Sequence, residues 1–464
     1  MFDSSGDGQP VPLHSALDFG KRRPSVGRSV HSHVSTTNHT ERKMKLHRRV
    51  FIAGGAITAF LGKNHPDFVW KKHPDFGKRE NPGLEDYLTQ ATLLAMQSAG
   101  VSPEQIQKGY VGNFAGELFN QQGHLGSMIA RGIDSLEGVP FTRVEGACAS
   151  GGLAVIGAIE AIAAGRDFVL AVGAEAQTTV SAREGADYLA RASHYASERS
   201  LDEFTFPAMF ARRAKHYFEA TGTTEADIGY VVAKAYANAN RNPLAHMKAV
   251  KIGLEQASAA SDANPYFLSN PDFREYLKIS DCSQVSDGGA AMVLVSEEGL
   301  RALGKTPDDA IEIVSYAQSN AALGRVRDYT RMDNSARAVA ENFADVGIAP
   351  SDIGVAEVHD CFAVTEVLMT EAIGLAKFGQ GSALAREGRT SITGDIPINT
   401  GGGLLAFGHP VGATGIKQVF EIARQMRGEC GDYQIAARPK YGLTVNMGGD
   451  DRTTVSMVIR DNSR

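Results

Sequence analysis

The sequence predicts an α/β protein built from two similar halves, with a helical segment inserted between them. From residue 47 onward, short apolar runs typical of strands alternate with longer segments of helical periodicity. Three short patterns in the first half recur in the same order in the second half. Residues 183–275, between the halves, have no counterpart in the second half.

The composition is that of an ordinary globular protein. The chain has 464 residues, of which 43% are hydrophobic and 22% charged, enough for two or three domains. Its net charge of −6 gives no indication of nucleic-acid binding, and no run of about 18 apolar residues predicts a membrane span. The four cysteines form no C-x-x-C pair, so neither a zinc site nor a disulfide scaffold is expected. Free thiols in a reducing compartment are the better interpretation.

Residues 1–46 differ from the rest of the chain. They are rich in Ser, Thr, His, Arg and Lys and poor in large apolar groups, so they cannot build a core. Two interpretations stay open: a mitochondrial transit peptide, or a disordered extension without consequence. A mitochondrial location is expected, with a peroxisome-type organelle as the alternative, although the C-terminal Asn-Ser-Arg is not the SKL signal.

The first core element is expected to be a strand at Val50–Ala53, turning at Gly54-Gly55. The surrounding stretch, "MKLHRRVFIAGGAITAFLG", also resembles a weak signal peptide. The strand is preferred because the pattern that follows depends on it.

The three repeated patterns divide the chain. "AGVSPEQIQKGYVGNF" and "VGIAPSDIGVAEVHDC" each contain a helix end at Gly, a turn opened by Pro, and a strand. "CASGGLAVIGAIEAIAAG" corresponds to "NTGGGLLAFGHPVGATGIKQVF", and "DFVLAVGAE" corresponds to "YGLTVNMGGD". We therefore expect a first core domain at 47–182 plus about 276–303, and a second at 304–464. Residues 183–275 form either a lobe that covers an active site or an ordinary extra subdomain.

Cys148 is the first candidate for chemistry. "TRVEGACASGGLAV" predicts a strand, a turn of small residues, and a helix that begins near Ala149. A thiol at this junction faces the positive end of the helix dipole and free N–H groups, which stabilise a thiolate. A buried structural cysteine is the equally plain alternative.

Two further stretches carry candidate partners for a thiol. His409 lies in the glycine-dense "GGGLLAFGHPVGATG", and histidine is the usual base that activates a thiol near neutral pH. In "VAEVHDCFAVTEV", His359 and Cys361 have the same strand parity and would face one cavity. Asp360 points the other way and is expected to cap the helix that follows. Cys282 and Cys430 lie beside no base and are assigned to structure.

These motifs together resemble the thiolase superfamily. The resemblance is carried by "CAS" at 148–150, "HDCF" at 359–362 and "GHP" at 408–410, supported by "VSDGGAAMVLVSEEG" at 285–299, and it extends over about residues 47–460. It implies a five-layered αβαβα fold made of two βαβαβαββ halves with an inserted loop domain. HDCF is the mark of the sterol-carrier-protein type of thiolase.

The chain departs from most thiolases at one position. Asn446 stands where the family carries a C-x-G cysteine, and only the glycine is kept, as Gly448. In the sterol-carrier-protein type, the HDCF loop supplies the missing thiol. The resemblance therefore implies that Cys361 takes the acid/base role for which position 446 has no cysteine.

The resemblance implies the cleavage of a 3-oxoacyl-CoA by CoA, in fatty-acid or related acyl-CoA metabolism. Cys148 would be the nucleophile and Cys361 the acid/base, while His409 would set the protonation of Cys148. His359 would replace an asparagine that holds a water in one oxyanion hole, and the backbone N–H groups of Cys148 and Gly448 would form the second. CoA is then a co-substrate, and no permanently bound cofactor and no metal is expected.

Other expectations concern partners and rival functions. The family implies a homodimer or tetramer that meets along an edge strand of the first half. No CoA-binding residue carries a motif, although Arg212, Arg213 and Lys215 of the inserted segment are conceivable. A ketoacyl synthase, which pairs its cysteine with two histidines, is one alternative. A catalytically inactive acyl-CoA or lipid carrier is the other.

Overall fold

The computed structural model describes residues 46–464, whose nine strands follow the order β3-β2-β4-β5-β1-β6-β9-β8-β7. The strands of the first half are β1 (Val50–Ile57), β2 (Lys108–Gly112), β3 (Phe141–Val144), β4 (Phe168–Glu175) and β5 (Gly288–Val295). Those of the second half are β6 (Ile311–Asn320), β7 (Ile353–Val358), β8 (Tyr441–Gly448) and β9 (Thr453–Asp461). β1 includes the predicted strand Val50–Ala53, but the turn predicted at Gly54-Gly55 was wrong: the strand continues through both glycines to Ile57, pairs with β5 over this stretch, and shows only a register shift between Ile52 and Gly54.

The two halves share one pairing pattern. β2 is parallel to β4, β4 is antiparallel to β5, and β5 is antiparallel to β1. β7, β8, β9 and β6 repeat these relations in the same order. The edge strand β3 has only a trace of a counterpart, the parallel bridge between Ala356 and Ile398. The predicted duplication is confirmed, with one strand of the second half reduced.

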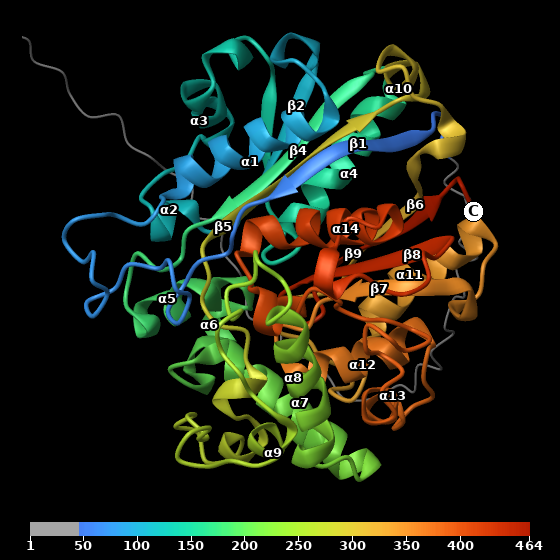
Figure 1. Ribbon diagram of the computed structural model, residues 1–464. Helices are drawn as coiled ribbons and strands as arrows, with labels where there is room; N and C mark the ends of the chain where they lie inside the picture. Colours follow the sequence, from blue (N-terminus) through green and yellow to red (C-terminus); the bar gives the residue numbers. More distant parts are fainter. Residues whose placement is uncertain (1–45) are drawn as a thin grey trace, which may run out of the picture. The chain divides into compact units, whose positions relative to one another are not determined.

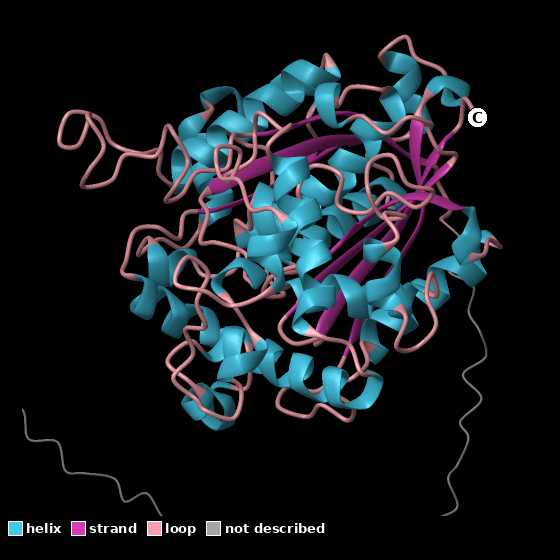
Figure 2. Ribbon diagram, turned by 60° about the horizontal axis from the view of Figure 1, so that its bottom comes forward, coloured by secondary structure: helices cyan, strands magenta, loops and turns pink. Residues whose placement is uncertain are grey.

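The two groups of strands touch at one corner. Only two residue pairs of β1 and β6 connect them, Val50 with Ile313 and Phe51 with Glu312. Figure 2 shows the two groups converging at one end and separated by helices elsewhere. Each group therefore behaves as a separate layer.

Helices supply the other three layers (Figure 1). α1 (Leu84–Ala99) packs on the first group of strands, and α11 (Asp333–Val346) packs on the second. α4 (Ser150–Ala163) and α14 (Val411–Arg427) pack against each other between the two groups. This is the αβαβα arrangement that the resemblance implies.

Local sequence explains why the halves look alike. α1 ends at Gly100 and α11 at Gly347, both with positive φ (70° and 77°), a conformation that glycine adopts without strain. One turn of 3-10 helix opened by Pro103 or Pro350 follows, and then β2 or β7 begins. Proline at the first helical position and glycine just past the end of a helix are the ordinary start and stop signals.

The segment between β4 and β5 forms the inserted lobe. Its helices are α5 (Ala182–Leu189), α6 (Tyr195–Glu198), α7 (Thr205–Thr221), α8 (Glu225–Ala239) and α9 (Leu254–Ser258). α8 packs against α12 (Ala363–Ile373) and α13 (Gly381–Arg386) of the second half. The remaining helices belong to the first half: α2 (Gly116–Phe119), α3 (Leu125–Gly132) and α10 (Glu297–Ala302).

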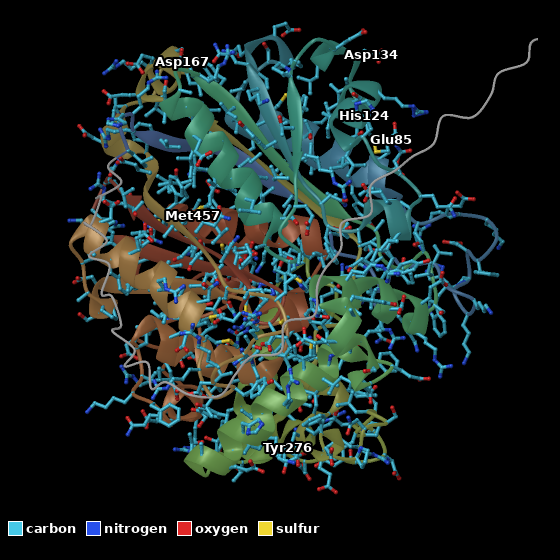
Figure 3. The ribbon with its side chains drawn as sticks, turned by 180° about the vertical axis from the view of Figure 1, so that it is seen from behind. Glu85, His124, Asp134, Asp167, Tyr276 and Met457 are labelled. Atoms are coloured by element: carbon cyan, nitrogen blue, oxygen red, sulfur yellow. The ribbon has the colours of Figure 1, made fainter. Side chains whose placement is uncertain are left out.

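The largest apolar core lies around the middle layer. Met457 on β9 is fully buried there, whereas Asp134 lies exposed at the margin of the first half (Figure 3). Within residues 46–464, no helix has both the length and the apolarity that crossing a membrane requires.

Candidate active site

Cys148 lies in a tight turn between β3 and α4, two residues before the helix begins. Ala147 has a φ of +52°, which residues other than glycine rarely adopt. The Ser150 hydroxyl donates to the Ala147 carbonyl (2.6 Å) and its oxygen accepts from the Gly146 N–H (3.0 Å). These bonds hold the thiol at the N-terminal end of α4, where the sequence predicted it.

The β8–β9 turn packs directly on the Cys148 turn. A Cβ atom at Gly448 would lie 2.0 Å from the Gly146 carbonyl oxygen, so only glycine fits there. Gly449 lines the cavity beside Cys148, and its backbone N–H faces the sulfur. The amide brought to the sulfur is that of Gly449. The expected part of the Gly448 N–H in an oxyanion hole stays a prediction.

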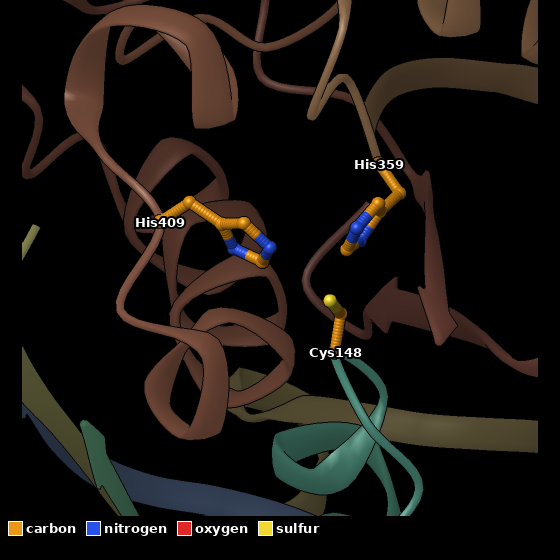
Figure 4. Close-up of side chains that lie close together, drawn as sticks. All are labelled: Cys148, His359 and His409. Carbon is orange, nitrogen blue, oxygen red and sulfur yellow. The ribbon is translucent and has the colours of Figure 1, made fainter. Parts of the chain in front are cut away.

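Two imidazoles from the second half meet the thiol (Figure 4). His359 follows β7 and His409 precedes α14. The Cys148 Sγ and one nitrogen of each ring lie within 4.8 Å of one another. The ring centroids are 5.0 Å apart and the rings are nearly perpendicular, at 87°. The structure therefore brings together three of the four side chains that the sequence named as catalytic.

His409 presents a lone pair to the cavity. Its Nδ1 lies 2.7 Å from the Thr414 Oγ1. The Thr414 hydroxyl donates to the Pro410 carbonyl at 3.0 Å, so its oxygen accepts from the Nδ1–H of His409. Nε2 then carries no hydrogen, and it is buried without a hydrogen-bond partner among residues 46–464. A free imidazole lone pair beside a thiol is what a general base requires.

His359 presents the opposite tautomer. Its Nδ1 accepts hydrogen bonds from the Met447 backbone N–H and from the Asn446 Nδ2, each at 3.3 Å. Both partners can only donate, so Nδ1 has no hydrogen and the ring hydrogen lies on Nε2. His359, which lines the cavity, can therefore donate a hydrogen bond to a ligand oxygen.

The three side chains have the spacing of a metal site, but their hydrogens do not suit a cation. A neutral imidazole binds a metal through the nitrogen that carries the lone pair. The lone pair of His359 faces two N–H donors, and its N–H faces the cavity. The arrangement fits an oxygen atom of an organic ligand better than a metal ion.

Burial keeps the three groups uncharged. It raises the pKa of the Cys148 thiol to about 12, despite the opposing effect of the Gly449 and Cys148 N–H groups. Burial also lowers the pKa of His409 to about 3 and takes the pKa of His359 well below its usual value. The predicted stabilisation of the thiolate by backbone N–H groups is present, but desolvation outweighs it. A neutral thiol of this kind needs a base to become a nucleophile.

Two more thiols line the same cavity. Cys361 lies there beside His359, as the sequence predicted, and so does Cys282, which the sequence assigned to structure alone. Burial raises the pKa of both thiols well above the usual range. The segments run side by side, because the Ser283 N–H donates to the Cys361 carbonyl at 2.9 Å. No neighbouring base in the sequence marks Cys282; only the fold brings it to the cavity.

Asp360 does not cap α12, so that prediction was wrong. Phe362 occupies the N-cap position and makes no side-chain cap. The Asp360 carboxylate instead accepts from the Leu404 N–H at 2.6 Å, and Gly403 packs on it so closely that a Cβ atom would lie 2.0 Å away. Residues 403–407 form one π-helical turn that leads to His409. Asp360 therefore connects the HDCF loop to the loop that carries His409.

A cavity of about 470 Å³ extends from Cys148 into the inserted lobe. This volume lies in the usual range for small-molecule sites. The lobe contributes Phe204, Phe206, Pro207 and Phe267, and within residues 46–464 no Asp, Glu, Lys or Arg lines the cavity. The lobe therefore forms part of the wall of the cavity beside Cys148, and the walls suit an apolar group.

The basic residues considered for the CoA nucleotide lie on α7 of the lobe. Arg213 is only 1% exposed and is ion-paired with Asp450 beside the Gly448–Gly449 turn, so it is committed to the fold. The Arg212 guanidinium lies over the Tyr329 ring, 4.4 Å from its centroid. Lys215 lies 5.9 Å from the Phe273 ring centroid.

The matched families agree with this architecture. The family model described as "Thiolase, N-terminal domain" matches residues 75–298, and "Thiolase C-terminal domain-like" matches residues 315–461. Together they span most of the chain, which belongs to the thiolase superfamily and is a thiolase-type acyltransferase.

Relatives narrow the position within the family. The chain is 37% identical over 369 residues to the acetyl-CoA acetyltransferase of Methanothermobacter thermautotrophicus. The matched region covers 79% of this chain and 92% of the relative. It is 29% identical over 419 residues to sterol carrier protein 2 of Rattus norvegicus, covering 86% of this chain and 70% of the relative. Such relatives support the sterol-carrier-protein type of thiolase.

Solved structures share the fold. The Ltp2-ChsH2(DUF35) aldolase has a TM-score of 0.71 at 23% identity and covers 90% of this chain and 98% of that chain. The Acat5 thiolase from Ascaris suum in complex with coenzyme A has a TM-score of 0.63 at 15% identity, covering 89% of this chain and all of that one. At these identities the likeness concerns the fold alone.

Proposed function

We propose that this protein cleaves 3-oxoacyl-CoA thioesters with CoA through an acyl group carried on Cys148. The observation that carries the proposal is the meeting of Cys148 with two imidazoles of opposite tautomer at the end of an apolar cavity, with Cys361 in its wall. An apolar, phenylalanine-rich wall supports an acyl group larger than acetyl.

In the first half-reaction, the Cys148 thiol gives its proton to the His409 Nε2, and the thiolate attacks C3 of the substrate. The C2–C3 bond breaks, the acyl group stays on sulfur, and the electron pair forms the enolate of acetyl-CoA. The His359 Nε2–H and the newly protonated His409 both donate toward the enolate oxygen. Cys361 then protonates C2, which releases acetyl-CoA and leaves a Cys361 thiolate.

In the second half-reaction, the CoA thiol gives its proton to the Cys361 thiolate and attacks the acyl carbon. The thioester oxygen becomes an oxyanion that accepts from the backbone N–H of Cys148 and from the turn at Gly448–Gly449. Cys148 leaves as a thiolate and recovers its proton from His409. All three groups return to their starting states, and the condensation direction uses the same steps in reverse.

The test is CoA-dependent loss of acetoacetyl-CoA and of a long-chain 3-oxoacyl-CoA. Cys148→Ala is expected to lose at least about 10³-fold in kcat, as removal of a nucleophile does elsewhere. Cys361→Ala is expected to lose a comparable factor, because C2 then lacks its acid. Cys430→Ala is the matched control, since Cys430 is buried outside the cavity. A wild-type protein that binds acyl-CoA without cleaving it would replace this proposal with a carrier function.

A condensing enzyme of the ketoacyl-synthase kind is the second candidate. One observation favours it: the compact group within 4.8 Å contains Cys148 and two histidines, and Cys361 is not part of it. Such an enzyme would keep its rate in Cys361→Ala and would accept a decarboxylating malonyl thioester, whereas a thiolase would do neither.

We further propose that two copies associate along β3, the edge strand of the first half, and that the protein acts in acyl-CoA metabolism of a mitochondrion. Among residues 46–464, β3 is the last strand on its side of the sheet, and Thr142 within it is exposed, which supports pairing with a second strand at this edge. Light scattering of the wild type and of a Thr142→Pro variant tests the association. The location stays a prediction from residues 1–46, of which 1–45 lie outside the described residues.

A further inference from the structure

Asn446 occupies the centre of the contact between the two halves at the site. Its side chain is buried on β8, with 2% of the residue exposed. The Oδ1 accepts from the Gly152 N–H of α4 at 3.2 Å, and the Nδ2 donates to the Cys148 carbonyl at 3.1 Å and to the His359 Nδ1 at 3.3 Å. One amide therefore touches the nucleophile's backbone and the oxyanion-site histidine.

The orientation of this amide is forced. Turning it over would set its oxygen against the Cys148 carbonyl and its NH2 against the Gly152 N–H. The neighbours also leave no room for it to move, since a Cβ atom at Gly152 or Gly415 would lie 2.8 Å or 2.3 Å from the Oδ1. The NH2 group must therefore face His359.

We propose that Asn446 is a positioning residue that holds His359 in the Nε2–H tautomer, so that this ring can only donate into the cavity. The Met447 N–H supports the same state from the backbone. The role of this hydrogen in turnover presupposes the reaction proposed above, whereas the tautomer itself does not. Asn446 then has a function of its own: its side-chain NH2 donates a hydrogen bond to the His359 Nδ1.

The surroundings make a neutral donor necessary. The titratable groups that share the cavity with His359 are Cys148, Cys282, Cys361 and His409; Cys148 is partly exposed and the other three are buried. Asp360, next in sequence, is turned away toward Leu404. An amide donates at every pH, so the tautomer of His359 does not change as these groups titrate.

Asn446→Asp would replace this permanent donor with a titratable group. When the new carboxyl group and His359 together hold one extra proton, either the carboxylic acid donates to Nδ1 or the ring is an imidazolium; Nε2–H is present in both states. When that proton leaves, the carboxylate draws the remaining ring hydrogen to Nδ1, and Nε2 loses it. The activity of Asn446→Asp should therefore fall as the proton shared by the new carboxyl group and His359 is lost.

The experiment compares kcat/KM from about pH 5.5 to about pH 9.5 for wild type, Asn446→Asp and Asn446→Leu. We expect kcat/KM of Asn446→Asp to fall as the pH rises, by about 10²–10³-fold, the usual effect of losing one oxyanion donor. This fall is called the descending limb of the pH profile. Asn446→Leu should be impaired without this limb. Asn342→Asp is the matched control, since Asn342 is equally buried but bonds to Ser315 in the outer layer. An equal loss at every pH, or no loss, in Asn446→Asp would overturn the proposal.

Two measurements keep the test decisive if Asn446→Asp does not fold. Asn446→Cys is smaller and donates through S–H until it ionises, so it should show the limb at alkaline pH. Imidazole ¹⁵N spectra of the wild type, assigned by comparison with His359→Asn, should show hydrogen on Nε2 and not on Nδ1. The opposite tautomer would refute the proposal, and because this measurement needs no turnover, it is independent of whether the thiolase reaction itself is found.

Discussion

Thr414→Val tests the assignment of His409 as the base. Valine has nearly the shape of threonine but carries a methyl group where the hydroxyl was. The Nδ1–H of His409 now donates to that hydroxyl at 2.7 Å, and Thr414 is only 1% exposed. The variant would leave the buried N–H without an acceptor, which costs about 1–3 kcal/mol. The ring hydrogen can move instead to Nε2, which faces the cavity, and there it would block the lone pair that takes the proton of Cys148.

We expect kcat/KM to fall by about 10–100-fold, since about 1.4 kcal/mol corresponds to a factor of ten. Alkylation of Cys148 by iodoacetamide at neutral pH should slow by a similar factor, because it needs the same proton transfer. Thr414→Ser keeps the hydroxyl and should remain near wild type in both assays. Rates within about twofold of wild type for Thr414→Val would show that Thr414 does not set the tautomer, and the reasoning would be wrong.

Three further outcomes follow from buried contacts. Gly448→Ala would place a Cβ atom 2.0 Å from the Gly146 carbonyl oxygen, so acyl transfer should fall at least about tenfold while circular dichroism stays native. Burial lowers the pKa of His246 to about 4, so the folded state disfavours its protonation and stability is lost as pH falls from 6.5 toward 4. Denaturant titrations at about pH 7 and about pH 5 should show that His246→Gln is spared about 2 kcal/mol of this loss. Arg213→Ala breaks a fully buried ion pair with Asp450 and should lower the free energy of unfolding by about 3–5 kcal/mol.

The duplicated fold could be predicted from the sequence because the residues that start and end its helices act locally. A glycine with positive φ ends α1 and α11, and a proline opens the turn that follows each helix. Such signals act over a few residues, so sequence patterns report them directly. The reduced third strand of the second half was not foreseen, because a single bridge at Ile398 leaves almost no pattern of apolar alternation.

The candidate nucleophile and its neighbours were readable from motifs, but their chemistry was not. Cys148, His359, Cys361 and His409 were all placed in one site by resemblance, and the cavity brings them together. The helix dipole suggested a stabilised thiolate, yet desolvation raises the thiol pKa instead. Burial depends on what the inserted lobe and the second half cover, which no local pattern contains.

By itself, the sequence determined the α/β duplication, the inserted lobe and the candidate site residues, since each depends on residue type and short spacing. Only the tertiary structure decided which histidine accepts a proton and which donates one. The state of His359 is set by hydrogen bonds to Asn446, which is separated from His359 by 87 positions and from Cys148 by 298. A ring's tautomer depends on the partner that the fold puts beside it, and for His359 that partner is chosen by packing between distant segments rather than by the histidine's own surroundings in the chain.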